Sequence, residues 1–267
     1  MFFRIHLHLV VLIALILPIV VEHASAAPRS IHVFVALADN DHQGIVPVPR
    51  LLGNGDDPDH NLYWGSAYGV RTFFSRSSDW KLVLRQSRLS SGIIERCVFR
   101  YRFQDVYLVA DAYRGRQIEQ AILDFFDAAA ADHPKETISL PDVTAGQVPP
   151  IPISGGADLV VYVGHDGLMD FKLSHQLVNR NRSTRPAIIL ACASRNYFAD
   201  GLRASGAHPL LWTTNLMAPE AYTLKAALDA WIAGEPDAAV RDSAAAAYAH
   251  YQKCSLAAAR KLFVSGW

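Results

Sequence analysis

The sequence predicts an α/β protein, a three-layer α/β/α sandwich with a mostly parallel central sheet. Short apolar runs bounded by Pro, Gly or Asp recur along the chain, as is typical of strands buried on both faces. Between them lie segments whose apolar residues stand three and four positions apart, which predicts amphipathic helices. Strands and helices that alternate in this way pack as a parallel sheet covered on both faces.

The first predicted strand, 31–39, is rich in β-branched and aromatic residues and is closed by polar turn formers. A long loop follows over 41–61, and its acidic tip at 54–59 could bind calcium, although clusters of Asp, Gly and Pro more often form plain turns. The rest of this half is predicted to contain helices at 61–74 and 115–131 and strands at 80–86, 96–103 and 106–110.

The segment 140–156 is rich in Pro and Gly, and we expect it to be a surface loop and not a domain boundary. After it the alternation resumes. Strands are predicted at 159–163, 187–191 and 209–213, and helices at 196–204, 219–232 and 237–264.

Composition limits the classes of partner. The chain has 267 residues, 51% of them apolar, with 25 basic and 25 acidic side chains. Because the net charge is balanced, neither a nucleic acid nor an anionic membrane surface is an expected partner. The length is sufficient for one domain with a substantial core.

The first 26 residues have the pattern of a secretory signal peptide. Arg4 precedes the apolar stretch 7–21, and Ala24-Ser25-Ala26 is a small-residue cleavage signal. We expect cleavage near Ala26, a mature domain over 27–267, and a secreted or periplasmic location. The alternative is an uncleaved anchor, the one case in which a membrane is an expected partner.

The chain contains three cysteines, Cys97, Cys192 and Cys254. In an exported protein this number excludes a disulfide framework and permits at most one bridge. Nothing in the sequence places Cys97 beside Cys254, so their pairing stays open.

Two neighbouring strands of the predicted sheet lead into reactive side chains, His165 and Cys192. Parallel strands end at a common edge, where ligands bind in open α/β sheets, so we expect the two side chains to meet there. A thiol beside an imidazole is a nucleophile–base pair. The alternative for each residue taken alone is packing, since Cys is among the most buried residue types and a histidine can be a hydrogen-bonded core residue.

The two strand ends, VVYVGHDG at 160–167 and AIILACAS at 187–194, resemble the caspase–gingipain–legumain group of cysteine peptidases, and the gingipain branch most closely. The resemblance implies a caspase-like sandwich in which Cys192 attacks the substrate carbonyl and His165 transfers the protons. It also implies that the backbone N–H groups of Cys192 and Gly167 hold the oxyanion. The chain departs from the family pattern at Asp166, where the family usually has Gly, and in the short separation of His165 from Cys192, 27 residues.

Further candidates for substrate binding lie at the ends of neighbouring strands. One set leaves the first strand, which neighbours the strand leading to His165: Asp39, Asn40 and Asp41. The other ends the strand after Cys192: Trp212, Thr213 and Asn215. Turn formation is an alternative role for the first set, and packing is an alternative for Trp212. The connection that contains His175, Asn179, Arg180 and Arg182 is a further candidate for substrate contact.

Apart from the acidic tip at 54–59, the sequence gives no reason to expect a metal, and it gives none to expect a cofactor. It has no Cys-x-x-Cys or His-x-x-x-His spacing, no Gly-x-Gly-x-x-Gly or phosphate loop after a strand, and no Gly-x-Ser-x-Gly. The expected function is therefore an exported cysteine-dependent hydrolase, an endopeptidase with a Cys-His dyad that acts on a protein or peptide. The alternative is a catalytically inactive domain of the same fold that binds a protein or another ligand.

Overall fold

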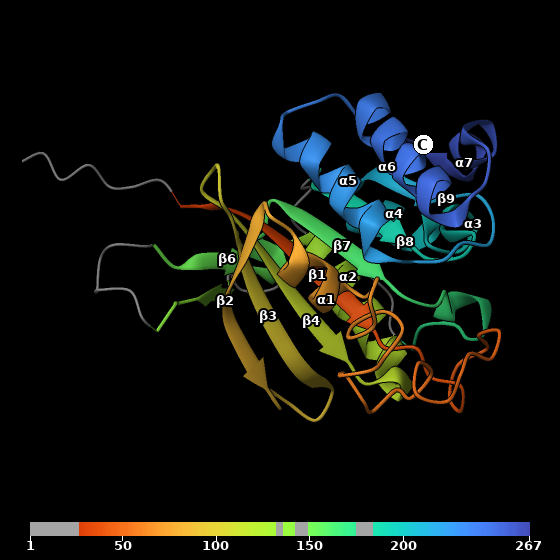
Figure 1. Ribbon diagram of the computed structural model, residues 1–267, viewed down its shortest axis with the longest axis horizontal. Helices are drawn as coiled ribbons and strands as arrows, with labels where there is room; N and C mark the ends of the chain where they lie inside the picture. The colour runs from red at the N-terminus through yellow and green to blue at the C-terminus, as the bar shows by residue number, and fades with distance from the viewer. Residues whose placement is uncertain (1–26, 132–135, 142–148, 175–183) are drawn as a thin grey trace, which may run out of the picture.

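The computed structural model describes residues 27–131, 136–141, 149–174 and 184–267 (Figure 1). The predicted signal peptide and the candidate contacts at His175, Asn179, Arg180 and Arg182 lie outside these residues. Within the described ranges, no helix combines the length and the apolar character needed to cross a membrane.

An eight-stranded sheet forms the centre of the molecule, in the order β10-β9-β8-β7-β1-β4-β3-β2. The five inner strands run parallel: β9 (His208–Thr213), β8 (Pro186–Leu190), β7 (Leu159–Val163), β1 (Arg29–Ala36) and β4 (Val106–Tyr113). Antiparallel pairings occur only toward the two edges of this sheet, through β10 (Phe263–Val264), β3 (Ile93–Tyr101) and β2 (Trp80–Ser87). The mostly parallel sheet confirms the predicted fold class.

Helices cover both faces of the sheet, which gives three layers. One face packs against α1 (Val70–Arg76), α5 (Ala221–Ile232), α6 (Asp237–Gln252) and α7 (Leu256–Leu262). The other packs against α2 (Ile118–Ala130), α3 (Ser194–Tyr197), α4 (Ala199–Ser205) and a small sheet of β5 (Glu136–Ile138) and β6 (Ile151–Ile153). Figure 1 shows the C-terminal helices gathered over the β8–β9 half of the sheet, with β2 and β3 at the opposite edge.

Strand β1 shows why the apolar runs are continuous. Val33 and Val35 face the core beneath α1 and α5, while Phe34 and Ala36 face the core beneath α2. Successive side chains of a strand point to opposite faces, so a strand covered on both sides needs apolar residues at every position.

Two predicted helices are shorter in the structure. The helix predicted at 61–74 begins only at Val70, because residues 61–69 form turns around Asn61, whose side-chain oxygen accepts the N–H groups of Ala38 and Tyr63. The helix predicted at 237–264 ends at Gln252, where Lys253 adopts a left-handed conformation with φ 55°. Ser255 then caps α7 by accepting the Ala258 N–H, and the chain finishes in β10.

Two further predictions are corrected in detail. The segment 140–156 is not only a loop, because Ile151–Ile153 forms β6, whose isoleucines are buried against the sheet. The helix predicted at 196–204 is two short helices, α3 and α4, which meet at Phe198. Phe198 is fully buried against the rings of Phe125, Phe126 and Tyr162, and this packing decides the local path of the chain.

A buried ionic network crosses three strands of the sheet. Asp111 on β4 accepts bidentate hydrogen bonds from Arg96 on β3, at 2.5 and 2.6 Å. It also contacts His32 Nε2 on β1 at 3.0 Å, and the other His32 ring nitrogen accepts the Ser154 N–H. Asp111 and His32 are almost wholly buried, so the charge on Asp111 depends on these partners.

We expect Asp111→Ala to lower the free energy of unfolding by about 3 to 5 kcal/mol, because it leaves the Arg96 guanidinium buried without its carboxylate. Urea unfolding followed by circular dichroism measures the change. Asp105→Ala is the matched control, since Asp105 is half exposed and lies 3.9 Å from Arg100, and its loss should cost less than about 1 kcal/mol. Equal midpoints for the two variants would show that the network does not stabilise the fold.

Candidate functional site

His165 and Cys192 leave adjacent parallel strands at the same edge of the sheet. β7 and β8 pair in register, with Val163 opposite Leu190, and the two side chains follow two residues later on each strand. Both line one pocket of about 380 Å³. His165 is 7% exposed and Cys192 is half-buried.

The walls of this pocket come from loops that are far apart in the sequence. Its lining is mostly apolar and consists of Gly44, Ile45, Val46, Leu62, Tyr63, Gly164, His165, Met169, Cys192, Leu216, Met217, Ala218, Pro219, Glu220 and Gln252. Three of these apolar side chains are exposed at 83, 42 and 66%: Val46, Met169 and Leu216. Exposed apolar groups around a pocket are typical of a surface that contacts another molecule.

His165 is held by a carboxylate that the sequence analysis did not single out. Its Nε2 lies 2.7 Å from Asp170 Oδ2, and the same oxygen accepts the Gly44 N–H at 2.9 Å. When the Nε2–H group of His165 donates a hydrogen bond to Asp170, the lone pair of the imidazole lies on Nδ1. Nδ1 is then the nitrogen that can act as a base. Tyr162 adds a second restraint, since its hydroxyl donates to the His165 carbonyl at 2.8 Å.

The Cys192 side chain forms two hydrogen bonds with the backbone of Met217. The Met217 N–H donates to Sγ at 3.4 Å, and the thiol donates to the Met217 carbonyl at 3.5 Å. Burial raises the pKa of the Cys192 thiol, the Met217 N–H opposes this rise, and the charge of Asp166 adds to it. Among the described residues no hydrogen bond joins Sγ to His165. Because its pKa is raised, the thiol needs a base to take its proton in order to react.

The turn after Cys192 is strained. Ala193 has φ 46°, in the left-handed region that a residue with a Cβ rarely adopts. Its N–H donates to the Asn215 carbonyl at 2.9 Å, which holds the turn in this conformation. Observed backbone strain of this kind clusters at functional sites, and here it sets the direction in which the chain leaves Cys192.

The two predicted oxyanion donors differ in availability. The Gly167 N–H donates to the His165 carbonyl at 3.1 Å, and a Cβ at Gly167 would meet the Phe171 ring at 2.7 Å. Gly167 is therefore needed for a close approach, and its N–H is already engaged. The Cys192 N–H has no acceptor in the part of the chain that the structure describes, which leaves it free to bind an incoming oxygen.

Asp166 does not orient His165. It is fully buried, its Oδ1 accepts the Leu168 N–H at 3.1 Å, and its Oδ2 is buried without a hydrogen-bond partner among the described residues. Burial raises the pKa of Asp166 to about 7. As the pH rises through this value, a negative charge develops beside Cys192 and disfavours the thiolate.

We therefore expect Asp166→Asn to lower the pKa of Cys192 and to increase its rate of alkylation by iodoacetamide several-fold near pH 7. The reason is that the variant removes the negative neighbour while keeping the size of the side chain. The measurement is the alkylation rate of the Cys192 peptide as a function of pH, by mass spectrometry. The fully exposed Asp200→Asn serves as control, and a profile for Asp166→Asn identical to that of the control would contradict this expectation.

The residues predicted to follow β1 do not line the pocket but build the loop beside it. Asp39 Oδ1 accepts the N–H groups of Asp41 and His42, and the Asn40 side chain both donates to and accepts from the Val48 backbone. These bonds shape the segment 40–48, whose residues Ile45 and Val46 reach the pocket.

The residues predicted at the end of β9 also lie outside this pocket. Trp212 is 1% exposed and packs in the core on the α2 side of the sheet. This is the packing role that was the alternative to substrate binding for Trp212. The buried Thr213 hydroxyl donates to the Ala191 carbonyl. Asn215 lines a separate pocket, described below.

Sequence reasoning missed Asp170 and Glu220. An acidic residue five positions after His165 was visible, but only the short 3₁₀ helix Gly167–Met169 turns Asp170 back onto the imidazole. Glu220 reaches the pocket from the start of α5, and no local pattern marks it. Its carboxylate accepts from the Tyr222 hydroxyl at 2.7 Å and from Gln252 at 3.1 Å.

Within the described ranges, no group of three His, Cys, Asp or Glu side chains is arranged to hold a metal ion. The three cysteines are free thiols, and Cys97 is buried while Cys254 is exposed.

Comparisons with protein-family models, with curated proteins and with solved structures find no match to this chain.

Proposed function

We propose that this chain is an exported cysteine-dependent hydrolase, an endopeptidase, in which Cys192 is the nucleophile and His165 the acid–base partner. The observation that carries the proposal is that adjacent parallel strands bring the thiol and the imidazole into one pocket. The order of the two strands along the chain supports a caspase-like relationship, which is part of this proposal.

The chemistry follows from the geometry of the pocket. His165 removes the Cys192 thiol proton as Sγ attacks the carbonyl carbon of the scissile amide, and the carbonyl oxygen becomes an oxyanion near the free Cys192 N–H. The C–N bond then breaks, and the proton on His165 passes to the leaving amine. Water attacks the resulting thioester, His165 takes a proton from it, and the released Cys192 sulfur recovers its proton. Asp170 positions His165 throughout this cycle.

The charge of the pocket suggests the class of side chain it accepts. Among the described residues that line it, Glu220 is the only acidic one, and apolar side chains make up most of the walls. A long side chain with a terminal positive charge matches this combination, because its stem packs on apolar walls while its end pairs with the carboxylate.

The direct test is incubation of the purified protein with a peptide library, with cleavage followed by mass spectrometry. We expect cleavage at a restricted set of bonds, enriched in basic residues on one side, and its loss after treatment with iodoacetamide. A protein that leaves every peptide intact would refute the proposal.

The second candidate is a peptide-binding domain without catalysis. It is favoured by the engagement of Sγ with Met217 and by the burial that raises the pKa of Cys192. This candidate predicts saturable peptide binding, no cleavage, and the same Kd after Cys192→Ala.

A further inference from the structure

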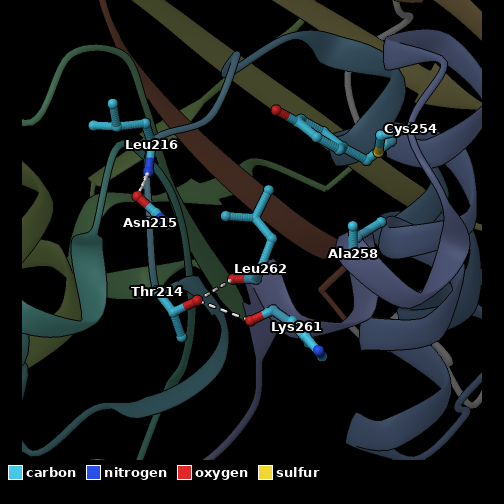
Figure 2. Close-up of a pocket in the computed structure, with 9 residues that line it drawn as sticks. Thr214, Asn215, Leu216, Cys254, Ala258, Lys261 and Leu262 are labelled. Atoms are coloured by element: carbon cyan, nitrogen blue, oxygen red, sulfur yellow. Dashed lines mark hydrogen bonds between the residues drawn. The ribbon is translucent and has the colours of Figure 1, made fainter.

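A second pocket lies beside the first and shares a wall with it. It has a volume of about 370 Å³ and is formed by the chain after β9, by α6, by the turn after α6 and by α7 (Figure 2). Its lining is Thr214, Asn215, Leu216, Tyr248, Cys254, Ala258, Ala259, Lys261 and Leu262. Leu216 lines both pockets.

The segment 215–218 is the common wall, and it is fixed from both sides. Met217 holds the Cys192 sulfur on one side, as described above. On the other side, the Ala218 N–H donates to the Tyr248 hydroxyl at 3.2 Å. Figure 2 shows the Leu216 side chain turned away from Leu262 and Ala258, so its backbone borders the second pocket while the exposed side chain stands on the rim.

The two pockets differ in the charged residue at their border. Lys261 is the only Lys, Arg, Asp or Glu among the described residues that line the second pocket, its side chain is exposed, and within the described chain no carboxylate pairs with it. The Thr214 hydroxyl in this lining is engaged, since it donates to the Lys261 carbonyl at 2.8 Å. Apolar groups such as Leu262 and Ala258 complete the lining. This lining suits a neutral or acidic side chain and repels a basic one.

We propose that the second pocket is a subsite of the hydrolase, which receives a neutral or acidic side chain of the same peptide whose basic side chain occupies the first pocket. This inference rests on the proposed function, because it requires that a peptide lies across Cys192. The two pockets are continuous at Leu216, so a peptide chain that leaves the first pocket over this residue enters the second directly. The recognised pattern is then a basic residue close to a neutral or acidic one.

The test compares a minimal substrate, which fills only the first pocket, with peptides extended on either side of it. We expect extension in one direction to raise kcat/KM about tenfold or more, with acidic or neutral residues preferred over basic ones at the extended position. Ala258→Trp fills the second pocket from the exposed surface of α7 and should remove this gain without changing the minimal substrate. Ala257→Trp is the matched control, since Ala257 is exposed on the same helix and does not line the pocket.

A charge reversal tests the selectivity separately. Lys261→Glu should shift the preference at the extended position from acidic to basic residues, with the minimal substrate unaffected. If Ala258→Trp and Ala257→Trp behave alike, or if extension on neither side raises kcat/KM, the subsite is refuted while the hydrolase proposal stands. If the wild-type protein cleaves no peptide at all, both proposals fall.

Discussion

Replacement of Cys192 by alanine is expected to lower kcat/KM for peptide hydrolysis at least about a thousandfold. The substitution removes the thiol proposed to form the covalent acyl intermediate, while His165 and Asp170 stay in place. The remaining activity would come only from binding and from the Cys192 N–H, which an alanine retains. Because the hydrogen bonds of Sγ within the described chain go only to the Met217 backbone, the fold should tolerate the change.

The measurement is the rate of cleavage of a peptide identified from the library, with folding checked by circular dichroism. Cys97→Ala is the matched control, because Cys97 lies on β3 in the core and lines neither pocket. This control should keep the wild-type kcat/KM although it loses some stability. Equal loss of activity in the two variants, or full activity in Cys192→Ala, would remove Cys192 from the mechanism.

Substitution of Asp170 by asparagine is expected to lower kcat about a hundredfold or more. An asparagine can turn its amide N–H₂ toward His165 Nε2, which would then carry the lone pair and leave the proton on Nδ1. In that tautomer Nδ1 is no longer a base toward the thiol. The same change weakens the bond from the Gly44 N–H, so the loop that carries Ile45 and Val46 also loses an anchor.

The two consequences of Asp170→Asn can be separated in one experiment. A positioning role for the imidazole predicts a fall in kcat with a displaced pH profile, and partial rescue by Asp170→Glu. Loss of the Gly44 anchor alone predicts a rise in KM at unchanged kcat. Asp200→Asn, an exposed carboxylate on α4, is the control for the loss of one negative charge. An unchanged kcat and pH profile would show that His165 needs no carboxylate partner.

The elements that local pattern predicted best are those whose residues are buried on both sides. The strand at 159–163 matches β7 residue for residue, because every position of LVVYV must be apolar to lie between two layers. The prediction of one helix at 237–264 was wrong, because the local pattern does not mark where the helix ends. Its alanine-rich pattern continues past Gln252, and nothing in that periodicity shows that Lys253 turns the chain back to form α7 and β10.

Within the candidate site, the two reactive residues were predictable and their surroundings were not. His165 and Cys192 follow apolar strands directly, so the parallel topology is enough to place them at one edge. Trp212 was predicted near the site by the same reasoning, applied to the next strand, β9. Side chains alternate between the two faces along this strand, however, and that of Trp212 points into the core on the α2 side. Strand order therefore predicts the edge at which a residue lies, but not the face to which its side chain points.

The sequence by itself determined the α/β class, the parallel strands and the common edge for thiol and imidazole, since these follow from hydrophobic period and chain order. Only the tertiary structure decided that Asp170 holds His165, that Met217 holds Cys192 and that Glu220 reaches the pocket. Each of these contacts joins a loop to a strand end or to a distant loop. Their geometry depends on how loops pack against one another, and local sequence does not encode that packing.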